Sequence, residues 1–204
     1  MADFTAQDVM VLRKAAGVGM MDAKDALTES GGDLDVAGVL LREKGLAKTA
    51  KRAGREASEG TIGSYLHEQG GRVVTGVVVY LSSETDFVAK SPDFVDAARD
   101  LAMHIAWANP QWATIDDVDA DALEAEKSLI AKQAENEGKP AAVIDKIVEG
   151  RIRKYYEENV LLEQKFVNAE KFEGTVGEMV QALAVTMGEN ISIKSFSRLA
   201  VGGE

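Results

Sequence analysis

The side chains that most often carry covalent chemistry are scarce in this sequence. It has no cysteine and only two histidines, His67 and His104. The lack of cysteine excludes a thiol nucleophile, a disulfide framework and a thiolate metal site. Neither histidine accompanies a recognisable nucleophile motif, so each is expected to be a partly exposed or a core histidine. We therefore predict no catalytic residue and no metal site.

Three further segments match a ligand site only in part. Gly17–Gly19 begins like a dinucleotide-binding loop, but it lacks the third glycine and follows a predicted helix rather than a strand. Gly45–Thr49 contains the Lys-Thr pair of a phosphate loop without the glycine-rich cradle before it. The acidic residues at 116–121 lack the glycine and the distal glutamate of a calcium loop. No cofactor is expected at any of them.

Two segments remain as candidates for contact with another molecule. Met20 and Met21 fall in a predicted turn between two helices, and methionine is adaptable enough to suit a contact surface. Filling of a small core is an equally good interpretation of this pair. Ser83–Lys90 joins a predicted buried strand to a helix. In it, Phe87 is a core residue with Asp86 in a turn, or the two form an exposed wedge, and composition leaves both interpretations open.

Charge is distributed unevenly along the 204 residues. The net charge is −11, of which residues 1–55 carry +1 and residues 56–204 carry −12. The first part ends in a stretch, 44–55, with five basic and no acidic residues. This stretch has no aromatic residue to stack on a base, and the field of the whole chain repels phosphate. We interpret it as a solvated basic linker, predict no nucleic-acid partner, and place a domain boundary near residue 55.

The sequence contains no signal for export or for a membrane. No apolar run reaches the roughly 18 residues that a membrane helix needs. The first residues have neither the basic nor the apolar region of a signal peptide. A cytoplasmic protein without a membrane partner is therefore expected.

Residues 1–55 predict three short helices. Thr5 and Asp8 have the spacing of a capping box at the start of the first helix. The second helix should begin near Met21, and Asp33 is placed to cap the third. Three helices of this length enclose only a thin core. Such a module more often binds an apolar patch on another molecule than a buried substrate.

Residues 56–204 mix strands and helices. Strands are predicted at 61–67, 72–81, 160–167 and 191–195, and helices at 92–109, 114–137, 143–155 and 176–187. The second and third of these helices, separated at Gly138–Pro140, are expected to form an antiparallel hairpin. Trp107 and Trp112 should pack as apolar caps around Pro110, and a bulge or an end is expected at Phe196. The predicted class is α+β, with a three- or four-stranded antiparallel sheet covered by helices on one face.

Taken together, several segments resemble bacterial elongation factor Ts. They follow the order of that family along almost the whole chain. The segments are Leu12-Arg13, Gly17–Leu27, Glu84–Lys90, His104–Ala106, Glu137–Pro140, Lys146–Arg151 and Leu161–Gln164. The Gly-Met-Met-Asp and Thr-Asp-Phe-Val blocks within them are the most specific.

The resemblance implies a guanine-nucleotide exchange factor that binds elongation factor Tu and promotes GDP release without covalent chemistry. Residues 1–55 would form a module like the ubiquitin-associated (UBA) domains, and residues 56–204 a core and dimerisation domain. The residues implied to contact the GTPase domain of the partner are Leu12, Met20 and Met21. Those implied to intrude near the magnesium bound to the partner's nucleotide are Thr85, Asp86, Phe87 and Val88.

The resemblance also bears on assembly. The core contains one of the two related halves of the long family form, which implies a homodimer like that of the short members, held without disulfides. Ser83 stands where the family usually has cysteine, and Lys165 replaces a proline, which bears on the predicted strand around it. The alternative, from another class, is a non-catalytic adaptor with a UBA-like module and a dimerising core. An enzyme acting through the acidic helix ranks third.

Overall fold

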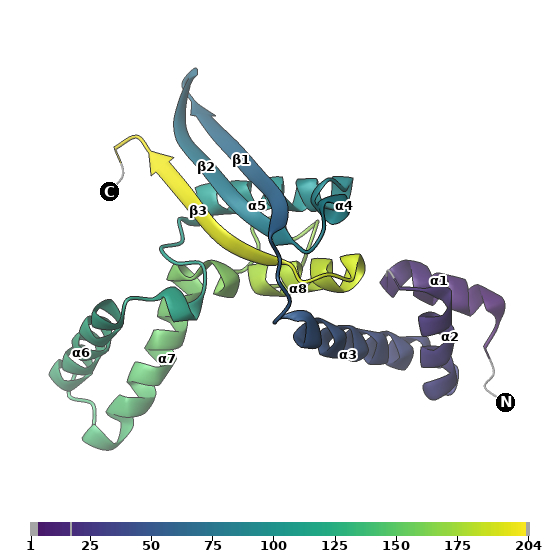
Figure 1. The fold of residues 1–204 in the computed structure, drawn as a ribbon. Helices are drawn as coiled ribbons and strands as arrows, with labels where there is room; N and C mark the ends of the chain where they lie inside the picture. Colours follow the sequence, from purple (N-terminus) through teal and green to yellow (C-terminus); the bar gives the residue numbers. More distant parts are fainter. Residues whose placement is uncertain (1–3, 17, 203–204) are drawn as a thin grey trace.

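The computed structural model describes residues 4–16 and 18–202, which form the predicted α+β fold with three antiparallel strands (Figure 1). The elements in the first half are α1 (Ala6–Ala16), α2 (Met20–Glu29), α3 (Leu34–Arg52), β1 (Glu59–Gln69), β2 (Arg72–Ser83), α4 (Asp86–Ala89) and α5 (Pro92–Ala108). Those in the second half are the 3-10 helix η1 (Ile115–Asp117), α6 (Ala120–Asn136), α7 (Ala141–Asn159), the 3-10 helix η2 (Leu161–Glu163), α8 (Val176–Met187) and β3 (Ser192–Ala200). No helix in these ranges is long and apolar enough to cross a membrane.

Helices α1, α2 and the first part of α3 pack around a small core of their own. We call this part of the chain the module. The predicted capping box is present: the Thr5 N–H donates to Asp8 Oδ2 at 2.7 Å, and the Asp8 N–H donates to Thr5 Oγ1 at 3.2 Å. Asp33 caps α3 by accepting from the Asp35 and Val36 N–H groups. The buried side chains are Val9, Leu12, Ala23, Ala26, Leu27, Ala37 and Leu41. Gly17, where the sequence predicts an end to the first helix, lies outside the described residues.

Helix α3 leaves the module and continues to Arg52, so the interpretation of 44–55 as a linker was wrong for most of its length. Lysine, alanine, leucine and arginine are good helix formers, and they outweigh the one glycine. Gly45 sits where α3 packs on α8, and a Cβ there would lie 2.8 Å from Val185 Cγ1. Glycine therefore permits the close approach of the two helices. The division of the chain at residue 55 stays a prediction.

The sheet has the order β1-β2-β3, and both strand pairs are antiparallel. Gly70 and Gly71, each with positive φ, make the two-residue turn between β1 and β2. A bulge was expected near Phe196. It occurs two residues earlier, at Lys194, because Ile193 pairs with Leu81 while Ser195 pairs with Tyr80. β3 then continues to Ala200.

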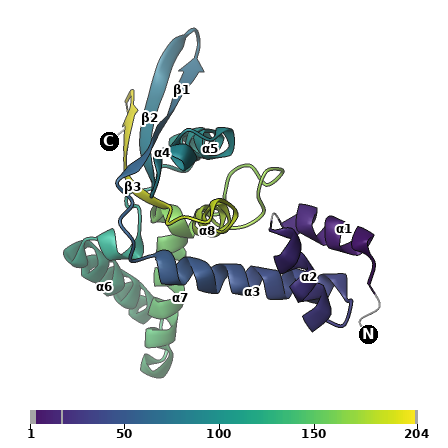
Figure 2. The same ribbon diagram turned by 45° about the vertical axis from the view of Figure 1, so that its right-hand side comes forward.

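Helices α5 and α8 cover one face of the sheet (Figure 2). The large core beneath them includes Val77, Val79, Leu81, Phe94, Leu101, Ile105, Val176 and Val180. On the opposite face, Ile62, Leu66 and Leu199 are 61%, 63% and 76% exposed. This core holds β2 and α5 together, so both ends of the segment that joins them are fixed.

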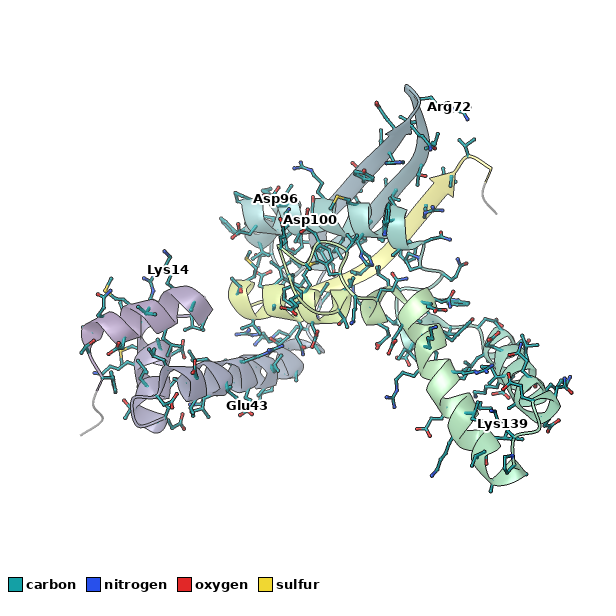
Figure 3. All side chains as sticks on the ribbon, turned by 180° about the vertical axis from the view of Figure 1, so that it is seen from behind. Lys14, Glu43, Arg72, Asp96, Asp100 and Lys139 are labelled. Atoms are coloured by element: carbon teal, nitrogen blue, oxygen red, sulfur yellow. The ribbon has the colours of Figure 1, made fainter. Side chains whose placement is uncertain are left out.

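Helices α6 and α7 form the predicted antiparallel hairpin, which projects away from the sheet with Lys139 near its tip (Figure 3). Thr114 and Asp117 form a capping box, in which the Thr114 N–H donates to Asp117 Oδ2 at 2.9 Å. It begins η1 instead of the long helix. A second cap, Asp119, accepts from the Ala122 N–H at 2.8 Å and begins α6.

The strand predicted at 160–167 is wrong. The chain there forms η2 and only isolated bridges, Trp112 with Val160 and Lys165 with Thr175. Val160 and Leu161 are both fully buried, so the side chains do not alternate between two faces as in a half-buried strand. This correction leaves three strands from the predicted range of three or four.

The packing predicted for Trp107 is also wrong, because 81% of this residue is exposed at the end of α5. Trp112 is half-buried, and its ring lies 6.0 Å from that of Tyr155 on α7. Trp112 therefore packs toward the α6–α7 hairpin beside Pro110, whereas Trp107 at the end of α5 is exposed to solvent.

Candidate partner-binding site

The segment between β2 and α5 presents Phe87 to solvent. α4 is a single turn, Asp86–Ala89, and 84% of Phe87 is exposed. The next two residues face the other way: Val88 packs against the large core, and Ala89 is buried. Of the two interpretations of the sequence, the exposed aromatic is the one found. We call Thr85–Val88 the wedge.

The wedge is held at its start by residues from a distant part of the chain. The Glu189 carboxylate accepts from the N–H groups of Glu84 and Thr85, at 3.0 and 3.1 Å, and from the Thr85 hydroxyl at 2.5 Å. In return, the Asn190 N–H donates to Glu84 Oε1 at 2.7 Å. We call Glu84, Thr85, Glu189 and Asn190 the clasp. Sequence reasoning missed Glu189 and Asn190, because their only signal is that they follow the glycine that ends α8.

The wedge also carries ionised groups. Lys90 Nζ donates to Asp86 Oδ2 at 2.7 Å, and this hydrogen bond and charge lower the pKa of Asp86 below its usual value and raise that of Lys90. The pKa of Glu84 is lowered mainly by the hydrogen bond from the Asn190 backbone, with Arg55 contributing. At neutral pH an exposed aromatic ring therefore stands beside a fixed carboxylate.

The module has an exposed apolar surface of its own. Met20 and Met21 are the first residues of α2, not turn residues, and they are 47% and 63% exposed. Met10 on α1 is 53% exposed. Leu12, expected as a third contact residue, is only 4% exposed and lies in the core of the module. In this structure it is a core residue of the module and not an exposed contact residue.

The wedge and the module lie on the side of the molecule away from the α6–α7 hairpin (Figure 1). They are joined by α3, which packs in the module through Ala37 and Leu41 and on α8 through Gly45. Two candidate contact surfaces thus stand on one continuous framework.

The two histidines take the places expected of them. His104 is 1% exposed, its Nε2 lies 3.0 Å from Gln164 Oε1, and its Nδ1 accepts from the Val167 N–H at 3.2 Å. Burial lowers the pKa of His104, so the imidazole is neutral and serves as a core hydrogen-bonding group. His67 is exposed on β1, its ring stacked beside that of Tyr65.

The acidic segment at 116–121 is a solvated surface. Asp116, Asp117, Asp119 and Asp121 are all exposed, and two of them cap η1 and α6. Within the part of the chain that the structure describes, no three histidine or acidic side chains are grouped so that they could hold a metal ion.

An exposed aromatic on an anchored turn and exposed methionines on a separate small core are features of proteins that act by binding other proteins. Comparison with known proteins identifies the family within this class. The model of the family described as Elongation factor TS matches residues 45–204. Proteins named elongation factor Ts from Alkaliphilus oremlandii, Fervidobacterium nodosum and Solidesulfovibrio magneticus are similar over 98%, 98% and 99% of this chain, at 50%, 46% and 47% identity. The matches cover 90%, 99% and 98% of those relatives. The chain belongs to the elongation factor Ts family of translation factors.

Proposed function

We propose that this protein is a guanine-nucleotide exchange factor that binds elongation factor Tu carrying GDP, in the cytoplasm, and promotes release of the GDP. One observation carries the proposal. In a member of the elongation factor Ts family, Phe87 is 84% exposed on a turn whose two ends are fixed. The protein needs no catalytic residue or cofactor for this activity, because no covalent bond changes.

The wedge would act on the magnesium site of the partner. Magnesium bridges nucleotide phosphates to protein oxygens and requires near-ideal octahedral geometry. A rigid ring inserted beside it displaces the surrounding groups, and the fixed Asp86 carboxylate accompanies the ring. Val88 anchors the wedge in the large core, and Thr85 caps it. Distortion of the metal site weakens the binding of GDP.

The module supplies a second contact. Met20 and Met21 provide adaptable apolar side chains for the GTPase domain of the partner, and Leu12 contributes to the core of the module that carries them. Two contacts on one framework bind more tightly than either alone, because the second forms at a high effective concentration. We assign affinity mainly to the module and nucleotide release mainly to the wedge.

Homodimerisation through the open face of the sheet is part of the proposal. Three rows of paired residues cross this face: Ile62, Tyr80 and Ser195; Ser64, Val78 and Ser197; Leu66, Gly76 and Leu199. None of the nine is charged, although the chain has a net charge of −11. A face without charged residues lets two such copies approach without bringing like charges together. Because the chain has no cysteine, the dimer would be held without disulfides.

The alternative is an adaptor that binds a partner through the module and dimerises through the core. Release of fluorescent GDP from elongation factor Tu distinguishes the two functions. Exchange activity predicts that the release rate rises with the concentration of the chain, to a plateau. Binding of the chain, seen by ultracentrifugation, with an unchanged release rate would favour the adaptor.

A further inference from the structure

The wedge is too short to fix its own direction. α4 has four residues, and a single isolated helical turn is unstable in water. Its exposed ring gains nothing from the core, so the direction of Phe87 depends on what holds the backbone around it. Val88 and Ala89 hold the end of the turn, and the clasp holds the start.

Within the clasp, the Glu189 carboxylate accepts three hydrogen bonds from the residues at the start of the wedge. One oxygen of its carboxylate accepts two backbone N–H groups, of Glu84 and Thr85, and the other accepts the Thr85 hydroxyl. The same Thr85 Oγ1 accepts from the Val88 N–H at 3.4 Å. The carboxylate thus fixes the residue that caps the wedge.

Asn190 connects the clasp to the segment that follows α3. Its Nδ2 donates to the carbonyl of Arg55 at 2.8 Å and lies 3.4 Å from that of Ala53. The Arg55 guanidinium in turn lies 3.4 Å from Glu84 Oε2. Because α3 carries the module, two adjacent residues in the turn after α8 hold both the wedge and the connection to the methionine surface.

We propose that Glu189 and Asn190 are positioning residues for nucleotide exchange: Glu189 directs the wedge, and Asn190 fixes the module relative to it. This inference rests on the proposed exchange function. Neither residue needs to touch the partner. A displacement of about 1 Å in a positioned group reduces a rate by up to ~100-fold, so loosening the clasp should be measurable.

A double-mutant cycle between Glu189→Gln and Phe87→Ala tests the role of Glu189. Glutamine has the same size, but it lacks the negative charge and keeps only one oxygen, so one of the two positions that accept hydrogen bonds in the parent chain becomes a donor. In the parent chain, Glu189→Gln should lower the maximal rate of GDP release about 10-fold or more, short of the full ~100-fold of a 1 Å displacement. With Phe87→Ala already present, it should change the rate less than ~2-fold, because the two substitutions then act through one group.

The matched control is Glu170→Gln, which makes the same change of charge. Glu170 is exposed and has no hydrogen bond or ion pair with any described residue, so its variant should release GDP at the parent rate. Equal slowing by Glu189→Gln in both backgrounds, or none in the parent chain, overturns the inference. Should Glu189→Gln fail to fold, as judged by thermal unfolding, Glu189→Asp replaces it in the same cycle, with the same outcomes. Failure of the exchange function is a separate outcome, because the parent chain itself would then leave the rate of GDP release unchanged.

Asn190→Ala tests the connection to the module. It removes the two bonds from Nδ2 and keeps the backbone bond to Glu84. We expect a rise of severalfold in the concentration of chain that gives half-maximal release. This rise should disappear when Met20 and Met21 are both alanine. A rise that persists in that background overturns the role of Asn190.

Discussion

Replacement of Phe87 by alanine measures what the exposed ring contributes to exchange. An enclosed phenylalanine buries about 150–250 Å², and 84% of this one is available to a partner. Covering ~170 Å² at ~25 cal/mol per Å² gives about 4 kcal/mol, as an upper value. Anchor residues at interfaces span about 2–4 kcal/mol on truncation. Since each 1.4 kcal/mol is tenfold, GDP release at equal chain concentration should slow between about 30-fold and about 700-fold.

The assay is stopped-flow release of fluorescent GDP from elongation factor Tu, with each variant titrated to saturation. Trp107→Ala is the matched control, because Trp107 is 81% exposed on the same layer of helices but lies outside the wedge. It should release GDP at the parent rate. Thermal unfolding of Phe87→Ala should match the parent, since an exposed side chain contributes little to stability. Parent-like release by Phe87→Ala would refute the role of the wedge.

Three further predictions concern the module, the dimer and the buried histidine. Replacing Met20 and Met21 by serine should weaken binding to elongation factor Tu by about 10-fold or more, as measured by calorimetry. The fold should be retained because both side chains are exposed. Unchanged affinity would show that the module does not contact the partner through these residues. Leu66→Asp should shift the sedimentation of the chain from dimer to monomer, because it places like charges against each other, whereas Leu129→Asp on α6 should not. Because the folded chain keeps His104 neutral and lowers its pKa, the unfolded chain binds the extra proton. The free energy of unfolding in urea should therefore fall as the pH drops below ~6.5, with a slope of at most about 1.4 kcal/mol per pH unit from this group; an imidazole NMR titration with a midpoint at or above 6.5 would contradict this.

Sequence reasoning succeeded where the signal was local. Helix caps such as Thr5 with Asp8 and Asp33 before α3 need only residues two or three apart, and both caps are present. The strands on either side of Gly70-Gly71 and the helical hairpin around Gly138–Pro140 are predictable for the same reason. Each of these features is encoded by neighbouring residues.

It failed where distant residues decide the structure. The segment 160–167 is apolar enough for a strand, but Gln164 instead donates to the Glu158 carbonyl and pairs with His104 on α5. Local sequence does not determine the exposure of Phe87, because that exposure depends on Val88 facing the core and on Glu189, 104 residues beyond Thr85. No local pattern records such contacts.

The measurement that tests the central claim most directly is the affinity of the chain for elongation factor Tu with and without GDP and magnesium. An exchange factor must bind the nucleotide-free partner more tightly than the partner that carries GDP. By linkage, GDP weakens the binding of the exchange factor by the same factor by which the exchange factor weakens the binding of GDP. We predict that saturating GDP and magnesium lower the affinity for the parent chain severalfold or more, and that Phe87→Ala reduces this difference. Equal affinity for the two forms of the partner would contradict the proposed exchange function.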